Sequence, residues 1–107
     1  MNIRKIDDSF SVTGQITTAD VKALAEAGYR GIICARPDGE DAGQPTFAEI
    51  ASAAESAGLK AVQIPVSGAP NESQLASFKE ALADMDGPIL GYCRSGGRAG
   101  NLYQATR

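Results

Sequence analysis

The sequence predicts an α/β protein with a mainly parallel sheet flanked by helices. Short apolar runs typical of buried strands alternate with segments whose apolar residues recur at helical spacing, and this alternation favours right-handed crossover connections. Helices are expected to stop at Gly28, at Gly58 and at the Gly87-Pro88 pair. A chain of 107 residues is long enough for one core, so we expect a single domain over residues 1–107.

The first half of the chain supplies two strands and a helix. We expect the opening segment, with Phe10–Thr13, to be an edge strand. Thr17–Asp20 opens a helix with a capping residue and a first-turn acid, and that helix ends at Gly28. Arg30–Ala35 is predicted to be a buried strand, and a polar loop with a Pro-Asp-Gly turn follows over Arg36–Pro45.

The second half repeats the alternation. A capping box at Thr46–Glu49 opens a helix that runs to Gly58, and Lys60–Val66 is the next strand. Asn71 is expected to cap a helix that stops before Gly87. The strand Ile89–Cys93 then leads into a glycine-rich loop and a last, short helix. Ligands of such sheets bind at the carboxyl ends of the strands, which is where this loop lies.

The loop after the last strand combines a thiol with an anion site. Cys93 is followed by Arg94, by Ser95–Gly97 and by Arg98 at the entrance of a helix. Loop glycines let backbone N–H groups converge, and the helix N-terminus adds partial positive charge. This field favours the thiolate, so we expect Cys93 to be a nucleophile at neutral pH. Arg98 is expected to close the loop as the second catalytic residue.

The spacing of this loop bears on the reaction. Four residues separate Cys93 from Arg98. Protein tyrosine phosphatases have a similar loop with five, which widens the ring of N–H donors for a phosphate. The shorter Cys-Arg-Ser-Gly-Gly-Arg resembles the active loop of rhodanese-type sulfurtransferases, in which the cysteine takes up a sulfane sulfur. We expect the substrate to contact Arg94, Ser95, Gly96, Gly97 and Asp38.

Composition excludes several classes of function. Without histidine, the chain has no Cys-His or Ser-His dyad, and two cysteines cannot form a four-cysteine zinc site. We therefore expect no metal and no cofactor. The net charge of −3 gives no support to nucleic-acid binding, and no apolar run is long enough to span a membrane. The absence of a signal-peptide pattern and the reactive-site context of the thiols favour a cytoplasmic protein.

Three further residues leave alternatives open. Asp38 and Glu40 on the polar loop are candidate acids or substrate-orienting groups, or else a turn aspartate and a solvated glutamate. Cys34 ends a strand and is either a resolving thiol near Cys93 or an inert buried cysteine.

Further segments, together with the loop, carry a resemblance to a known family: Ser11–Ile16, Arg36–Glu40, Gln44-Pro45, Gly58-Leu59, Ile64–Val66 and Gly87–Arg98. In these segments the chain resembles the phosphatase-like domain of bacterial beta-lactamase hydrolase-like proteins. The resemblance implies the fold of cysteine-dependent dual-specificity phosphatases, and sulfur transferase or phosphatase activity. Relatives fused or linked to persulfide dioxygenase modules imply a role in sulfide detoxification and a persulfide dioxygenase partner.

Two departures from the phosphatase pattern favour sulfur transfer. A dual-specificity phosphatase carries an aspartate general acid on the loop after the strand that here ends near Pro65, whereas Val66–Asn71 contains no carboxylate. Tyr92 precedes the cysteine where tyrosine phosphatases usually have histidine. Sulfur transfer between thiolates needs no such acid.

The predicted function is that of a sulfurtransferase. Cys93 takes sulfur from an anionic donor such as thiosulfate or glutathione persulfide and passes it to a thiol acceptor. The alternative is a cysteine phosphatase that acts through a phosphocysteine. A third possibility is a non-catalytic anion-binding or redox-sensing module that uses Cys93 and Cys34.

Overall fold

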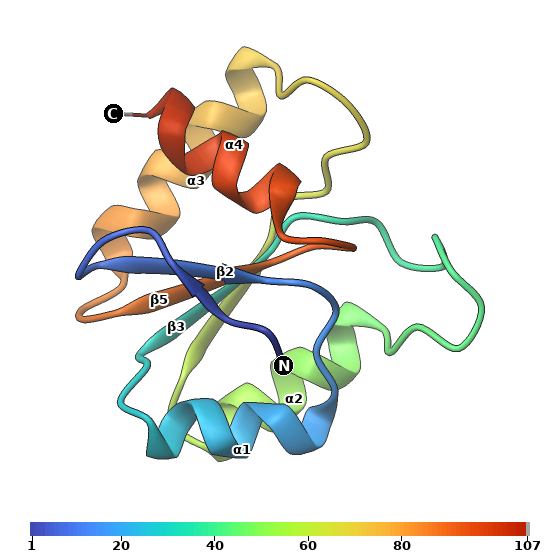
Figure 1. Cartoon of the computed structure of the whole chain (residues 1–107), viewed down its shortest axis with the longest axis vertical. Coiled ribbons are helices and arrows are strands. Elements are labelled where there is room, and N and C mark those ends of the chain that lie inside the picture. The colour runs from blue at the N-terminus through green and yellow to red at the C-terminus, as the bar shows by residue number, and fades with distance from the viewer. Residues whose placement is uncertain (107) are drawn as a thin grey trace.

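A five-stranded sheet with helices on both faces forms the molecule (Figure 1). The computed structural model describes residues 1–106. The strand order is β1-β2-β5-β3-β4, and every pair is parallel except β1 with β2. The α/β class and the mainly parallel sheet that the sequence predicts are therefore confirmed. The strands are β1 (Arg4–Lys5), β2 (Phe10–Thr13), β3 (Gly31–Cys34), β4 (Lys60–Gln63) and β5 (Ile89–Tyr92).

Four helices cover the sheet. In Figure 1, α1 and α2 lie below it, and α3 and α4 lie above it. Each of the first three helices begins with a capping box. The side chain of Thr17, Thr46 or Asn71 accepts a hydrogen bond from the backbone N–H three residues later, and the side chain of that later residue accepts one from the backbone N–H of the cap. The predicted starts of these helices are therefore confirmed. The helices are α1 (Thr18–Glu26), α2 (Phe47–Ser56), α3 (Glu72–Asp84) and α4 (Gly97–Ala105).

The prediction of an edge strand at Phe10–Thr13 is wrong. β2 lies inside the sheet between β1 and β5, and all four of its residues are buried. The edge is the two-residue strand β1, which is too short to give a periodic signal in the sequence. The polar residues Ser11 and Thr13 are buried along with Phe10 and Val12, as expected for a strand that is covered on both faces.

The register of the sheet brings its loops together. Tyr92 of β5 pairs with Thr13 of β2 on one side and with Cys34 of β3 on the other, so three strands end at the same level. Figure 1 shows the loops that follow β2, β3, β4 and β5 at the same edge of the sheet. The loop after Tyr92 is therefore surrounded by loops that are distant in the sequence.

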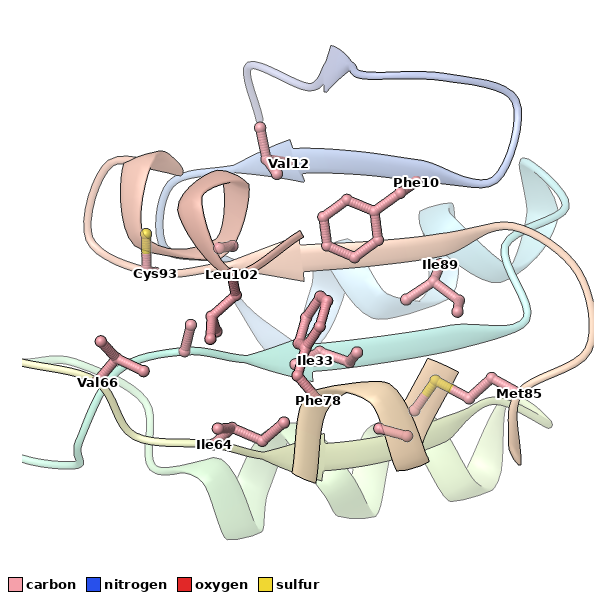
Figure 2. Close-up of a cluster of buried hydrophobic side chains, with 13 residues drawn as sticks. Phe10, Val12, Ile33, Ile64, Val66, Phe78, Met85, Ile89, Cys93 and Leu102 are labelled. Atoms are coloured by element: carbon pink, nitrogen blue, oxygen red, sulfur yellow. The ribbon is translucent and has the colours of Figure 1, made fainter. Parts of the chain in front are cut away.

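The core is divided by the sheet into two clusters. One lies under α3 and α4 and contains Phe10, Phe78, Leu102 and Cys93, as Figure 2 shows. The other packs against α1 and α2, and Cys34 belongs to it. No helix within residues 1–106 has the length and apolar character needed to cross a membrane.

Candidate active site

Cys93 lies directly after β5, where the strand gives way to the loop. Its backbone N–H donates to the carbonyl of Thr13 over 3.3 Å, which continues the pairing with β2 by one residue. Its side chain is fully buried and faces the cluster under α4 (Figure 2). The N–H of Gly96 donates to the Cys93 sulfur over 3.0 Å. A donor aimed at sulfur stabilises negative charge on it, as a thiolate nucleophile requires.

Gly96 makes this contact possible. It has a left-handed backbone with φ of 94°, a region that favours glycine, and it is the cap of α4. A Cβ at this position would also lie only 3.4 Å from the carbonyl carbon of Thr13. The N–H of the next residue, Gly97, contacts the hydroxyl oxygen of Ser95 over a long 3.4 Å. The turn thus places the N-terminus of α4 beside the sulfur.

Arg98 joins the loop to two other loops. Its Nη1 donates to the carbonyl of Val66 over 3.0 Å, and its Nη2 lies 2.8 Å from Oε2 of Glu40. The loop after β4, which lacks a carboxylate over Val66–Asn71, thus contributes a backbone oxygen to Arg98. Both terminal nitrogens of the guanidinium have partners without any substrate.

Arg94 points outward. Its side chain is 65% exposed, and its Nε lies 3.2 Å from Oδ2 of Asp41. An arginine at the rim of the site, tethered at one nitrogen, is suited to attract an anion from solvent.

A buried arginine that the sequence analysis did not single out organises this cluster. Arg36 is 1% exposed and is the second residue after β3. Its Nη1 donates to Oε1 of Gln15 over 2.8 Å, and its Nη2 lies 2.9 Å from Oε1 of Glu40 and 2.9 Å from Oδ2 of Asp41. The position of Arg36 at the carboxyl end of a parallel strand was the available signal, since ligand-side residues gather there.

The carboxylates between the arginines are held as anions. The hydrogen bond from Arg98 is the main reason why the pKa of Glu40 lies below its ordinary value, and Arg36 adds to the effect. The hydrogen bond from Arg36 lowers the pKa of Asp41 in the same way, with Arg94 contributing. Glu40 and Asp41 are therefore hydrogen-bond acceptors at neutral pH rather than proton donors.

Asp38 occupies a different place from its two acidic neighbours. Its Oδ1 accepts the N–H of Phe47, the first residue of α2, over 2.8 Å. This contact matches the turn aspartate that the sequence analysis left open. The predicted role of Asp38 in substrate binding remains a prediction, whereas Glu40 and Asp41 contact the loop arginines directly.

The two cysteines do not face each other. Cys34 pairs with Tyr92 in adjacent strands and packs in the cluster beside α1 and α2, whereas Cys93 faces the opposite cluster. The Cys34 thiol donates to the carbonyl of Arg36 over 3.4 Å, and burial raises its pKa above the ordinary value. Burial also raises the pKa of Tyr92, with Cys34 adding to the shift. These contacts favour an inert buried thiol over a resolving partner for Cys93, and the role of Cys34 remains a prediction.

A buried cysteine at the end of a parallel strand, followed by a glycine-capped helix and an arginine, defines the class of cysteine-dependent phosphatase folds. The chain belongs to the family of the phosphatase-like domain of beta-lactamase hydrolase-like proteins, whose model matches residues 2–107. It is 38% identical over 104 residues to the beta-lactamase hydrolase-like protein of Agrobacterium fabrum and to that of Xylella fastidiosa. The alignment covers 96% of this chain and 24% of each relative. The chain thus spans about a quarter of the length of the curated relatives.

Solved structures support the same fold. A phosphatase-like protein of Neisseria meningitidis is 34% identical, with a TM-score of 0.82 over 92% of this chain and 71% of that one. The catalytic domain of the PP-IP phosphatase SIW14 of S. cerevisiae has a TM-score of 0.70 at 20% identity and covers 95% of this chain and 62% of its own. At that identity the likeness shows the fold alone. The chain is thus a domain of a phosphatase-like family, and the name of the Neisseria relative is that of a phosphatase rather than of a sulfurtransferase.

Proposed function

We propose that this chain is a sulfurtransferase in which Cys93 carries sulfur as a persulfide. The observation that carries the proposal is the donation of the Gly96 N–H to the Cys93 sulfur over 3.0 Å, within a loop of four intervening residues. This amide points at the Cys93 sulfur, where it can stabilise the negative charge of a thiolate or of a persulfide. The fold by itself does not choose between the two reactions.

The reaction has two balanced steps. The Cys93 thiolate attacks the sulfane sulfur of thiosulfate, an S–S bond forms to Cys93, and the bond to the departing sulfite breaks. The terminal sulfur, now anionic on Cys93, is then attacked by an acceptor thiolate, which leaves with it as a persulfide and restores the Cys93 thiolate. Glutathione persulfide serves as donor in the same way, with glutathione as the leaving thiolate. No step needs a general acid.

The acidic residues of the site support this choice. Protonation of a poor leaving alcohol is worth roughly 10²- to 10⁴-fold in rate, so an efficient phosphatase benefits from a protonated carboxyl at the site. Glu40 contacts Arg98 but has a lowered pKa and is ionised at neutral pH. The segment Val66–Asn71 offers no carboxylate in its place.

The proposal is tested by mass spectrometry of the purified protein after incubation with thiosulfate. We expect one added sulfur atom on the peptide that contains Cys93, and its loss on addition of a thiol. An aryl phosphate assay is run in parallel on the same preparation. Efficient hydrolysis of phosphotyrosine without any sulfur uptake would reject the proposal in favour of the phosphatase.

Arg94 is proposed to capture the anionic donor. Arg94→Ala should raise the KM for thiosulfate about three- to tenfold and change kcat little, because the side chain is exposed and lies at the rim. The advantage of the unmodified protein should shrink as salt rises. Steady-state kinetics at low and high ionic strength provide the measurement. An unchanged KM would remove Arg94 from the site.

A cysteine phosphatase is the second candidate, and the name of the Neisseria relative, at 34% identity, supports it. Loop size separates the two candidates. Insertion of one glycine between Gly97 and Arg98 gives five residues between Cys93 and the arginine, which should admit a phosphate and loosen the hold on a single sulfur. Sulfur transfer should fall, and hydrolysis should appear only for aryl phosphates with good leaving groups. A gain of activity on alkyl phosphates would contradict the assignment of Glu40 as a non-donor.

A further inference from the structure

Two carboxylates lie where the anionic part of a substrate is expected to bind. Glu40 bridges Arg36 and Arg98 with its two oxygens, and Asp41 bridges Arg36 and Arg94 with a single oxygen. Both acids come from the loop after β3, whereas Arg94 lies in the loop after β5 and Arg98 in the first turn of α4. The ion pairs therefore connect the loop after β3 with the segment that follows Cys93.

The buried Arg36 holds both carboxylates in place. Arg36 is 1% exposed and is also held by Gln15. A buried guanidinium needs charge-paired partners, so Glu40 and Asp41 have a structural reason to remain near it. They are thus a permanent part of the site rather than surface acids that happen to approach an arginine.

The charges of this cluster nearly cancel. Three arginines, at 36, 94 and 98, carry three positive charges, and Glu40 and Asp41 carry two negative ones, which leaves one positive charge. The one excess positive charge can balance only one negative charge of a substrate. A second negative charge is left without a balancing cation in this cluster and is repelled by Glu40 and Asp41. The penalty grows with the charge of the substrate, since each added charge interacts with the same carboxylates.

We propose that Glu40 and Asp41 are specificity-determining residues that compete with the substrate for Arg98 and Arg94, so that the site prefers singly charged sulfur donors over divalent ones. This inference rests on the proposed function and names its substrate class: a monoanionic sulfane, such as an alkyl persulfide or a thiosulfonate, in preference to thiosulfate. Thiosulfate, the divalent donor, also reacts, but with a lower kcat/KM because the two carboxylates repel it.

The kinetic test compares two donors that differ in charge but transfer the same sulfur. Methanethiosulfonate is a monoanion that gives its sulfane sulfur to Cys93 and leaves as methanesulfinate, and thiosulfate is its divalent counterpart. Glu40→Gln should raise kcat/KM for thiosulfate about tenfold and for the thiosulfonate about threefold, because the repulsion removed scales with substrate charge. Asp41→Asn should shift the preference in the same direction.

The matched control is Glu55→Gln, which removes the same charge from an exposed position on α2. It should leave the preference between the two donors unchanged. An equal shift in Glu55→Gln and Glu40→Gln would mean that net charge rather than the cluster sets the preference, and the inference would be rejected. Melting temperatures without any anion establish that each variant is folded.

A binding test keeps this inference separate from the sulfurtransferase proposal. Sulfate and methanesulfonate form a divalent and monovalent pair that undergoes no reaction, and a ligand that binds the folded state raises the melting temperature. At constant ionic strength, sulfate should stabilise Glu40→Gln and Asp41→Asn more than the unmodified protein, even if no donor loads Cys93. If both anions instead raise the melting temperature of Glu40→Gln less than that of the unmodified protein, Glu40 is a positioning residue for Arg98. The proposal that Glu40 competes with the substrate would then be rejected.

Discussion

Replacing Cys93 by serine should lower sulfur uptake from thiosulfate by roughly 10⁴-fold or more, because removal of a nucleophile costs about that much or more and a serine hydroxyl is not ionised at neutral pH. The burial of Cys93 and the N–H of Gly96 aimed at its sulfur make it the one thiol suited to the reaction. Replacing Cys34 by serine should leave most of the activity, since Cys34 faces the other side of the sheet.

Sulfur uptake of both variants is measured by mass spectrometry and by the initial rate with thiosulfate. The melting temperature of each variant is recorded first, because Cys34 is buried and a hydroxyl in its place costs some stability. If a folded Cys34→Ser protein is as inactive as Cys93→Ser, the reaction uses both thiols. The single-nucleophile scheme would then be wrong.

Replacing Phe10 by alanine should lower the free energy of unfolding by about 3–5 kcal/mol, the usual cost of removing a buried aromatic ring. Phe10 is 1% exposed and stacks on Tyr103 with ring centroids 4.3 Å apart. It also meets Phe78 edge-on at 5.7 Å. The ring links β2 to α3 and α4, so its loss removes contacts among three elements at once. Urea denaturation followed by circular dichroism measures the change.

The control for Phe10→Ala is Phe47→Ala, the same change at a partly buried position on α2. Its cost should be clearly smaller, because less apolar surface is removed from the core. Equal losses for the two variants would contradict the expectation that the burial of Phe10 and its ring contacts make it the more important of the two.

The elements that the sequence predicted well are those with local signals. The capping boxes at Thr17, Thr46 and Asn71 lie within four consecutive residues each, so the starts of α1, α2 and α3 could be placed without the fold. The loop from Cys93 to Arg98 is equally local, and its contact between the Gly96 N–H and the sulfur spans three residues.

What the sequence left open depends on contacts between distant residues. The partners of Arg98 are Glu40 and Val66, which belong to loops after two other strands and meet only through the strand order. The importance of Arg36 follows from its burial, and no periodic pattern marks a single buried arginine. The position of β2 inside the sheet depended on β1, whose two residues give no detectable alternation.

The separation of Cys34 and Cys93 by the sheet has a consequence for damage by oxidants. The chain contains only these two cysteines, and they face different clusters. A Cys93 sulfenic acid therefore cannot form a protecting disulfide with Cys34 while the fold is intact. Rescue before irreversible oxidation to the sulfinic acid then requires a thiol from outside this domain. The lifetime of a reactive Cys93 under oxidative stress is thus expected to depend on the thiols that reach it.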